Sequence, residues 1–571
     1  MNIVNKFFLK LVLLPKKLYA GAGVHTVQLQ SILSVKLMMD DRRPNTFQQT
    51  QQRKKEKQVS TATLGTMLVS AILGLMFLFV FSIGQNMVTQ LTLYFSMFIF
   101  MLASTLIADF TSVLIDIRDN FIIMPKPVND RTVVVARLLH IFIHICKLIL
   151  PMTLPAFIYI IIKFGFAASL PFALMVLLAT MFTIFLINMV YIIILRITTP
   201  EKFKSIISYI QIAFAIIIYA GYQLVPRLMK DVMHTNIDLS HNTSMLLAPS
   251  YWFAAGWNIF HVFKGSLNEW MAFVAALFIP VASIYIVIKY MAPSFNQKLA
   301  MISGSETMET KPGNTVSTGN KLASPYLGWF SGVLTAKGAE RMGFLFAWKM
   351  TGRSRDFKLK VYPSIGYLVV IIAMMFLRSG NDQNIGSITT DPKGLRIIVV
   401  FALYMMSLLM ITAINQMIYS EKYKAAWLYF TAPVDTPGKI IAGAAKAVIL
   451  KFYIPLVVII STIGIFLLGV PFIPNLLLAL SNTVLIACCM VYISFRDLPF
   501  SKPQGNNARA GSFIKSLLSL VVPGLLGVIQ FLIYSITPVV IISAVLSVAA
   551  TWLVMDAIKR TPWQKIKAQY E

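Results

Sequence analysis

Charge is scarce in this chain. Asp, Glu, Lys and Arg make up 13% of its 571 residues, whereas hydrophobic residues make up 57%, and the mean hydropathy is +0.74. A soluble globular domain has about 25% charged residues, because water must solvate its surface. The shortage of charge therefore excludes an ordinary soluble protein and indicates a chain that lies largely in lipid.

Cysteine, metal-binding motifs and nucleotide-binding motifs are scarce or missing. The three cysteines, Cys146, Cys488 and Cys489, lie in apolar stretches, which excludes an extracytoplasmic disulfide framework. No G-x-x-x-x-G-K-[ST] loop occurs, so the chain cannot hydrolyse ATP by that route, and H-E-x-x-H is missing too. His140 and His144 stand near Cys146 without a neighbouring carboxylate, so we expect polar packing there and no metal site. We expect neither catalysis nor a bound cofactor.

Long apolar segments are abundant instead. A bilayer span needs about 20 mostly apolar residues, and its backbone polar groups must be satisfied within the segment, which favours helices. The sequence predicts an all-α membrane protein of about twelve transmembrane helices, at residues 61–83, 87–114, 135–162, 170–195, 206–224, 270–288, 362–376, 395–418, 447–470, 476–493, 513–533 and 536–555.

The net charge of +28 is concentrated in alternate loops. The first sixty residues hold eleven Lys or Arg against three acids, and the loop at 291–361 holds ten more. This bias places both termini in the cytosol and indicates contact with anionic lipid. Basic patches interleaved with aromatic residues are missing, so we expect no binding to nucleic acid. Residues 1–19 are predicted to form an amphipathic segment on the cytosolic surface.

One pattern occurs twice, about three hundred residues apart. Residues 118–137 and 424–443 align so that Phe121 meets Trp427, and Pro127-Val128 meets Pro433-Val434. Each stretch lies between the second and third predicted spans of its half, on the cytosolic side. An exposed aromatic residue beside charges is typical of a docking site on a partner. The pattern therefore predicts a duplicated protein in which each half carries a partner-binding element.

Two further repeats accompany these elements. Residues 34–43 and 347–356 each place an apolar stretch, a Lys and an Arg/Asp cluster ahead of a span, which predicts a helix lying in the membrane interface. Lys147 and Lys451 each stand four residues before a proline in the third span of their half, which predicts a kink there.

These patterns divide the chain into five predicted regions. They are an N-terminal cytosolic segment with the first interfacial helix at 1–60, the first six-span half at 61–290, a cytosolic linker and second interfacial helix at 291–361, the second six-span half at 362–556, and a cytosolic tail at 557–571.

The halves differ in an extracytoplasmic segment at 246–260, which is present only in the first. Its Tyr251, Trp252 and Trp257 predict either an interfacial anchor or a gate over the exit of a transport pathway.

The combined pattern resembles the permeases of ABC exporters of the second type, in the fused twelve-span form of the bacterial cytoplasmic membrane. The resemblance makes 35–43 and 348–356 elbow helices, and 119–130 and 425–436 coupling elements that dock into a separate ATPase. That ATPase is expected to be a dimer and to use ATP and Mg. It implies an exporter whose substrate the sequence does not identify. The residues implied to contact the ATPase are Arg118, Asp119, Phe121, Met124, Asp130, Arg131, Lys424, Trp427, Phe430 and Asp435.

The alternative is a secondary active transporter of six-plus-six architecture. Such a carrier needs buried ionisable groups on its route, and Asp109 is the clearest acid at depth in the predicted spans. Its counterpart is missing from the second half, which favours the ATP-driven exporter.

Overall fold

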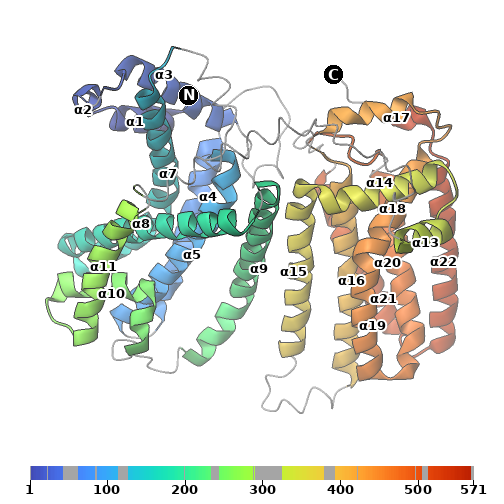
Figure 1. The fold of residues 1–571 in the computed structure, drawn as a ribbon. Helices are drawn as coiled ribbons and strands as arrows, with labels where there is room; N and C mark the ends of the chain where they lie inside the picture. Colours follow the sequence, from blue (N-terminus) through green and yellow to red (C-terminus); the bar gives the residue numbers. More distant parts are fainter. Residues whose placement is uncertain are drawn as a thin grey trace. The chain divides into compact units, whose positions relative to one another are not determined.

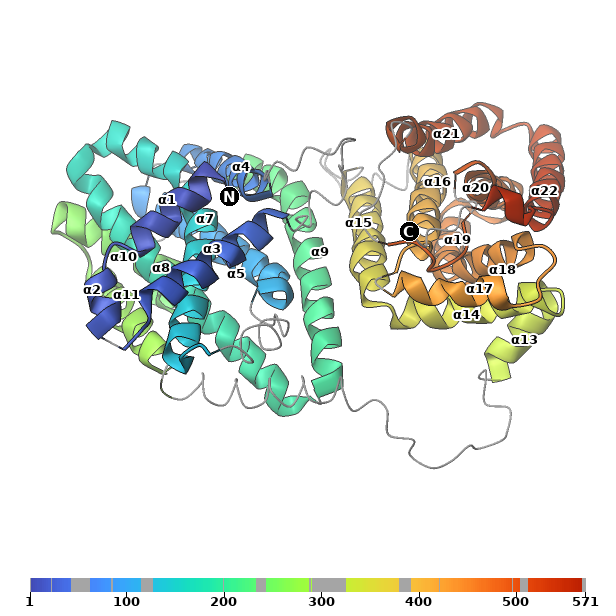
Figure 2. The same ribbon diagram turned by 90° about the horizontal axis from the view of Figure 1, so that it is seen from above.

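In the computed structural model the described residues are almost all helical, and the chain divides into two compact units (Figures 1 and 2). The first unit comprises most of the chain up to Gly313, and the second comprises Asn314–Glu571 together with Ile212–Gln223. The described residues are 2–21, 23–42, 62–83, 86–113, 127–198, 200–232, 243–286, 289, 325–378, 392–420, 422–494, 497–503 and 512–566.

The first unit begins with three helices ahead of its first long apolar helix. Its elements are α1 (Ile3–Val12), α2 (Lys16–Gly21), α3 (Thr26–Arg42), α4 (Ala62–Phe77) with the 3-10 turn η2 (Leu78–Ser82), α5 (Met87–Val113), α7 (Asp130–Phe164), α8 (Phe166–Ile197), the two ends of α9 (Pro200–Val232), η3 (Thr243–Leu247), α10 (Pro249–Val262) and α11 (Leu267–Ile286). The middle of α9, Ile212–Gln223, belongs to the second unit.

The second unit is helical too and begins with two helices ahead of its first candidate span. Its elements are α13 (Pro325–Leu334), α14 (Ala339–Arg353), α15 (Arg355–Arg378), α16 (Pro392–Met417), η6 (Tyr423–Trp427), α17 (Leu428–Thr431), α18 (Gly438–Val448), the π-helical turn η7 (Ile449–Tyr453), α19 (Ile454–Leu468), η8 (Val470–Phe472), α20 (Ile473–Ser494), α21 (Ser512–Ile533), α22 (Thr537–Lys559) and η9 (Trp563–Lys565).

The prediction of a multi-pass, all-α membrane protein is confirmed. Within the described ranges, nine helical segments are long and apolar enough to cross a membrane, or ten if the bent pair α10–α11 is counted as one span. The nine coincide with nine of the twelve predicted spans. The predicted fifth and eleventh spans appear as shorter apolar helices, Ser205–Gly221 and Ser519–Ile533. The twelve-span layout in two repeats therefore stays a prediction.

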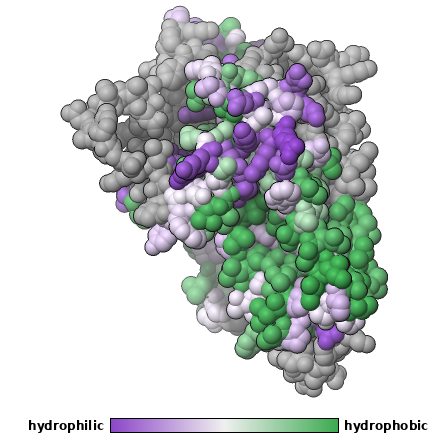
Figure 3. All heavy atoms as spheres, turned by 90° about the vertical axis from the view of Figure 1, so that its right-hand side faces the viewer, coloured by the Kyte–Doolittle hydropathy of each residue, from purple (hydrophilic) through white to green (hydrophobic). Residues whose placement is uncertain are grey.

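The surface of the second unit shows the division expected of a membrane protein. Figure 3 shows a broad apolar area below a hydrophilic band on this face. The helix at this edge of Figure 1 is α22, whose exposed side chains are largely apolar. Apolar side chains lose nothing by facing acyl chains, so such a surface belongs in the hydrocarbon region. Its most exposed members include Ile542, Val545, Leu546, Trp552 and Leu553.

The predicted interfacial helices pack against the third long helix of their own unit. In the first unit, the fully buried Leu29, Leu33 and Leu37 of α3 join one apolar cluster with Ala136 and Ile143 of α7. Their spacing of four residues places the three leucines on one helix face. That face therefore holds α3 against the N-terminal part of α7.

In the second unit the equivalent contact, between α14 and α18, is closer because glycines line it. A Cβ built on Gly343 would overlap the carbonyl oxygen of Ile440, and one on Gly443 would overlap that of Glu340. Small residues let two helix backbones approach within van der Waals contact. The pair thus forms a rigid base at the start of the third long helix.

The lysine–proline repeat has different consequences in the two units. Ahead of Pro455, the chain widens into the π-helical turn η7, which contains Lys451. Proline cannot donate to the carbonyl four residues back, and a π turn accommodates that loss. In the first unit, α7 remains helical through Pro151 and Pro155. The Lys451 ammonium donates to the Trp348 carbonyl at 2.8 Å and so joins this turn to α14.

Replacing Gly443 by Ala is expected to separate α14 from α18 and to destabilise the protein by about 1–3 kcal/mol, the usual cost of overpacking. The measurement is the thermal midpoint of the purified protein in mild detergent. Gly332→Ala is the matched control, because no atom lies within 4 Å of a Cβ at Gly332. Equal midpoints for the two variants would contradict the close packing.

Candidate partner-binding element

The repeated element of the second unit is a compact turn between α16 and α18. It consists of the 3-10 turn η6 followed at once by the single helical turn α17. Pro433 and Pro437 follow, and α18 begins at Gly438. Because proline restricts its own φ angle and that of the preceding residue, the two prolines stiffen the return of the chain to the membrane. Figures 1 and 2 show α17 beside α14 and α18.

A loop from later in the chain holds the element at its start. The backbone N–H of Phe500 donates to the carbonyl of Met417 at 2.8 Å, and the N–H of Ser420 donates to the carbonyl of Lys502 at 2.9 Å. The Tyr429 hydroxyl donates to the Pro499 carbonyl at 3.0 Å. Burial raises the pKa of Tyr429, so this hydroxyl keeps its proton and remains a donor.

The C-terminal residues hold the other end. The Trp563 indole N–H donates to the carbonyl of Val434 at 2.8 Å, and its ring centroid lies 5.2 Å from that of Phe430. The N–H of Gly438 donates to the carbonyl of Thr561 at 3.3 Å. The sequence reasoning did not single out Trp563, although a Trp among the basic residues of the tail was a signal that it packs against something.

On this support the element exposes large apolar side chains. Trp427 is 56% exposed, Leu428 63% and Phe430 40%. The charged side chains of Lys424 and Asp435 are exposed on the same element. Neighbouring exposed apolar residues on a rigid support, with charges around them, have the composition of a protein–protein contact.

The described part of the first repeated element is its return to the membrane. The amide N–H of Arg131 donates to the Asn129 side chain at 3.2 Å, so Asn129 caps α7. Arg131 itself is exposed, and Asp130 is the first residue of α7. Arg118, Asp119, Phe121 and Met124 lie outside the described residues, as does the side chain of Asp130.

In the second unit a buried ion cluster joins three helices behind the element. Glu340 of α14, 2% exposed, lies 2.7 Å from the ammonium of Lys446 on α18 and 3.1 Å from that of Lys559 on α22. Burial raises the pKa of the Glu340 carboxyl, but the hydrogen bonds and charges of Lys446 and Lys559 outweigh it, so the pKa lies below its usual value. The carboxylate is therefore ionised and binds both lysines.

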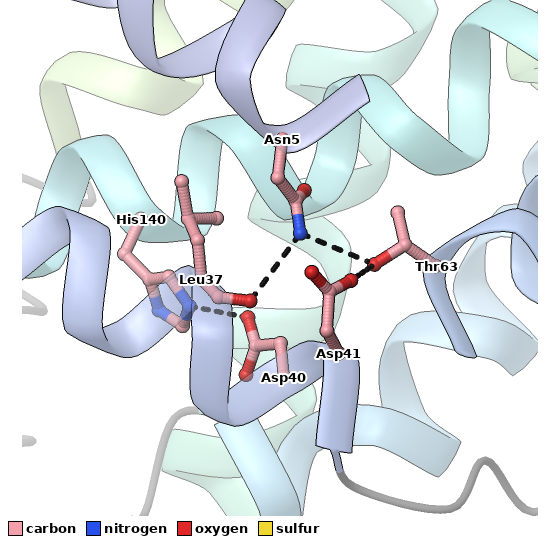
Figure 4. Close-up of polar contacts among 6 residues, drawn as sticks. All are labelled: Asn5, Leu37, Asp40, Asp41, Thr63 and His140. Carbon is pink, nitrogen blue, oxygen red and sulfur yellow. Dashed lines mark hydrogen bonds and ion pairs between the residues drawn. The ribbon is translucent and has the colours of Figure 1, made fainter. Parts of the chain in front are cut away.

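The first unit has a corresponding pair. His140 of α7 lies 2.6 Å from the carboxylate of Asp40 on α3 (Figure 4). Burial raises the pKa of Asp40, but the hydrogen bond and charge of His140, with the charges of His144 and Lys147, bring it below its usual value. In the repeat alignment, His140 and Lys446 occupy the same position, six residues after Val134 and Ile440. The sequence analysis did not use this match.

The segment predicted as an anchor or gate is packed inside the first unit. Tyr251 is fully buried and Trp257 is 1% exposed; the Trp257 indole donates to the Ala168 carbonyl at 2.9 Å. Trp252 is half-buried and donates to the carbonyl of Leu246 at 2.7 Å. The helix that carries them meets α11 at a bend of 108°, as in a broken span or a re-entrant loop. Gating by these residues stays a prediction.

No family model, no characterised protein and no solved structure matches this chain. Among the residues that the structure describes, no group of three His, Cys, Asp or Glu is placed to hold a metal ion.

Stability is expected to depend on the ionisation of Glu340. Because its pKa is lowered in the folded protein, the stabilisation is fully present above its unfolded-state pKa of about 4.3 and is lost as the pH falls through the lower folded-state value. Glu340→Gln is thus expected to cost about 1–3 kcal/mol at neutral pH and progressively less in acid. The measurement is the thermal midpoint of both proteins as a function of pH.

The control for this experiment is Asp556→Asn, which breaks the exposed Asp556–Arg560 pair. Exposed pairs contribute about 0–1 kcal/mol. A Glu340→Gln effect as small as that of the control, or one that grows in acid, would contradict the assignment.

Proposed function

We propose that the chain is the membrane-embedded permease subunit of an ATP-driven exporter of the bacterial cytoplasmic membrane. In this proposal Trp427, Leu428 and Phe430 dock into a separate cytosolic ATPase. The observation that carries the proposal is the exposure of these three side chains on a turn held from both ends. An apolar surface exposed without function would promote aggregation, whereas a rigid one binds a partner at a low cost in conformational entropy.

The position of the element supports a coupling role. It leads directly into α18, which is held to α14 by glycine contacts and to α14 and α22 by the Glu340 cluster. A movement of Trp427 is therefore transmitted to α18, α14 and α22 through rigid contacts. Energetic coupling between distant sites needs such contiguous, rigid contacts.

The first repeated element would supply the second contact with the ATPase, which is expected to be dimeric. Asp130 and Arg131 at its end begin α7, as the corresponding residues of the second element lead into α18. ATP with Mg would be bound by the partner, and closure of its two subunits would move the two elements. The substrate is an unidentified molecule that crosses the membrane.

Replacing Trp427 by Ala is expected to weaken ATPase binding without unfolding the chain. Truncating a central aromatic anchor commonly costs about 2 kcal/mol or more, which is roughly thirtyfold in Kd. The measurement is the amount of ATPase that co-purifies with the tagged protein from its host membrane in mild detergent. Trp329→Ala is the matched control, because Trp329 is 64% exposed but lies on α13.

Loss of the ATPase from the Trp427 variant alone supports the proposal. Equal recovery of the ATPase with the Trp427→Ala and Trp329→Ala variants would show that the ATPase contacts another part of the chain. A chain that co-purifies with no ATPase, and transports in response to an ion gradient in a manner abolished by Asp109→Asn, would show a secondary active transporter instead.

A further inference from the structure

The N-terminal segment of the first unit has an exposed apolar stripe in addition to its buried face. Ile3 is 82% exposed, Leu14 76% and Leu18 74%. Phe7 and Leu11 are exposed too, and at ~100° per residue they lie on the same side of α1 as Ile3. The opposite side is buried against α3 and α7, through Phe8, Leu9, Val12 and Leu13. The stripe therefore remains exposed when the opposite face of the segment packs against its own unit.

Basic side chains accompany the stripe. Lys6 and Lys10 on α1 are exposed, as are Lys16 and Lys17 on α2. No Asp or Glu precedes Asp40 in the sequence, so nothing within the segment neutralises these charges. An apolar stripe flanked by lysines suits an anionic surface into which side chains can also insert, and the cytosolic face of a bilayer is such a surface.

A polar network fixes the depth of the segment. The Asn5 amide donates to the Leu37 carbonyl at 3.3 Å and to the Thr63 hydroxyl at 3.4 Å, and Thr63 in turn donates to Asp41 (Figure 4). Thr63 is the first residue of the candidate span Thr63–Ser82. The segment is thus tied to the point at which α4 enters the bilayer, where lipid headgroups lie.

We propose that α1 and α2 form a membrane-binding platform that selects anionic phospholipid, with the apolar stripe inserted among the acyl chains and the four lysines on the headgroup phosphates. A free phosphate would leave the stripe uncovered. A protein partner would have to enter the layer that the headgroups already occupy. The bilayer alone satisfies both the apolar and the basic side chains at this depth.

The residues that follow the platform, Gly23 and His25 in the turn after α2 and Gln28 on α3, hold the end of the first repeated element. The Asn129 side chain donates to the Gly23 carbonyl at 3.0 Å, and Gln28 donates to the carbonyl of Pro127 at 3.3 Å. The backbone N–H of His25 donates to the Thr132 hydroxyl at 3.1 Å. If the element docks an ATPase, as proposed above, anionic lipid would regulate coupling by fixing the residues that support it.

The experiment measures how fast a water-soluble maleimide labels Leu14→Cys in the full chain, in nanodiscs of phosphatidylcholine alone or with about a quarter phosphatidylglycerol. Labelling of the parent protein gives the contribution of the native cysteines. Lys422→Cys, on the exposed element of the second unit, is the control for general accessibility. Labelling of Leu14→Cys is expected to be about tenfold slower with the anionic lipid, while that of the control is unchanged.

A second comparison tests the charge. Changing Lys6, Lys10, Lys16 and Lys17 to Gln is expected to abolish the dependence on anionic lipid, and changing four exposed lysines elsewhere is expected to preserve it. The control lysines are Lys264, Lys337, Lys422 and Lys439.

Equal labelling in both lipids would overturn the proposal, and so would protection that persists after the four platform lysines are changed. Protection that rises with protein concentration in detergent would show that a second copy covers the stripe, and would overturn it too. The measurement uses no ATPase, so failure of the coupling role of Trp427 leaves its outcome unaffected.

Discussion

A carboxylate on the predicted interfacial helix, paired with a basic side chain on the third long helix, sets the register of each unit. Asp40 pairs with His140 in the first unit, and Glu340 pairs with Lys446 in the second. A carboxylate withdrawn from water remains ionised only beside a partner, so neither interfacial helix can slide without leaving a charge unpaired. The pair therefore also fixes the position of the segments that pack against these helices.

The ends of the chain brace the two repeated elements in different ways. In the first unit Gly23, in the turn between α2 and α3, accepts a hydrogen bond from Asn129, and Gln28 on α3 donates one to Pro127. In the second unit the residues after α22, Thr561 and Trp563, bind the element and the start of α18. One duplicated pattern has thus been stabilised by N-terminal residues in one half and by C-terminal residues in the other.

This difference gives the units separate environments. Among the described residues, the second element is held by hydrogen bonds and a ring contact within its own unit. The support of the first includes a helix whose exposed stripe and lysines suit lipid. Under the two proposals together, the membrane surface supports the first coupling element, because the residues that hold this element directly follow the basic amphipathic helices α1 and α2.

The sequence alone determined that this is a multi-pass helical membrane protein, because an apolar segment of about 20 residues has only one way to satisfy its backbone in lipid. Nine of its predicted spans coincide with helices for this reason. It also directed attention to residues 424–443, because their pattern matches that of residues 118–137.

Only the tertiary structure decided what holds that element in place. Tyr429 meets Pro499, and Trp563 meets Val434 across 129 residues of sequence. Likewise Trp257 is buried against α8, although the Trp and Tyr residues of its segment are typical of the membrane surface. Periodicity reports whether a side chain faces an apolar medium, but it does not distinguish lipid from protein interior. That distinction depends on which distant helix happens to lie beside it.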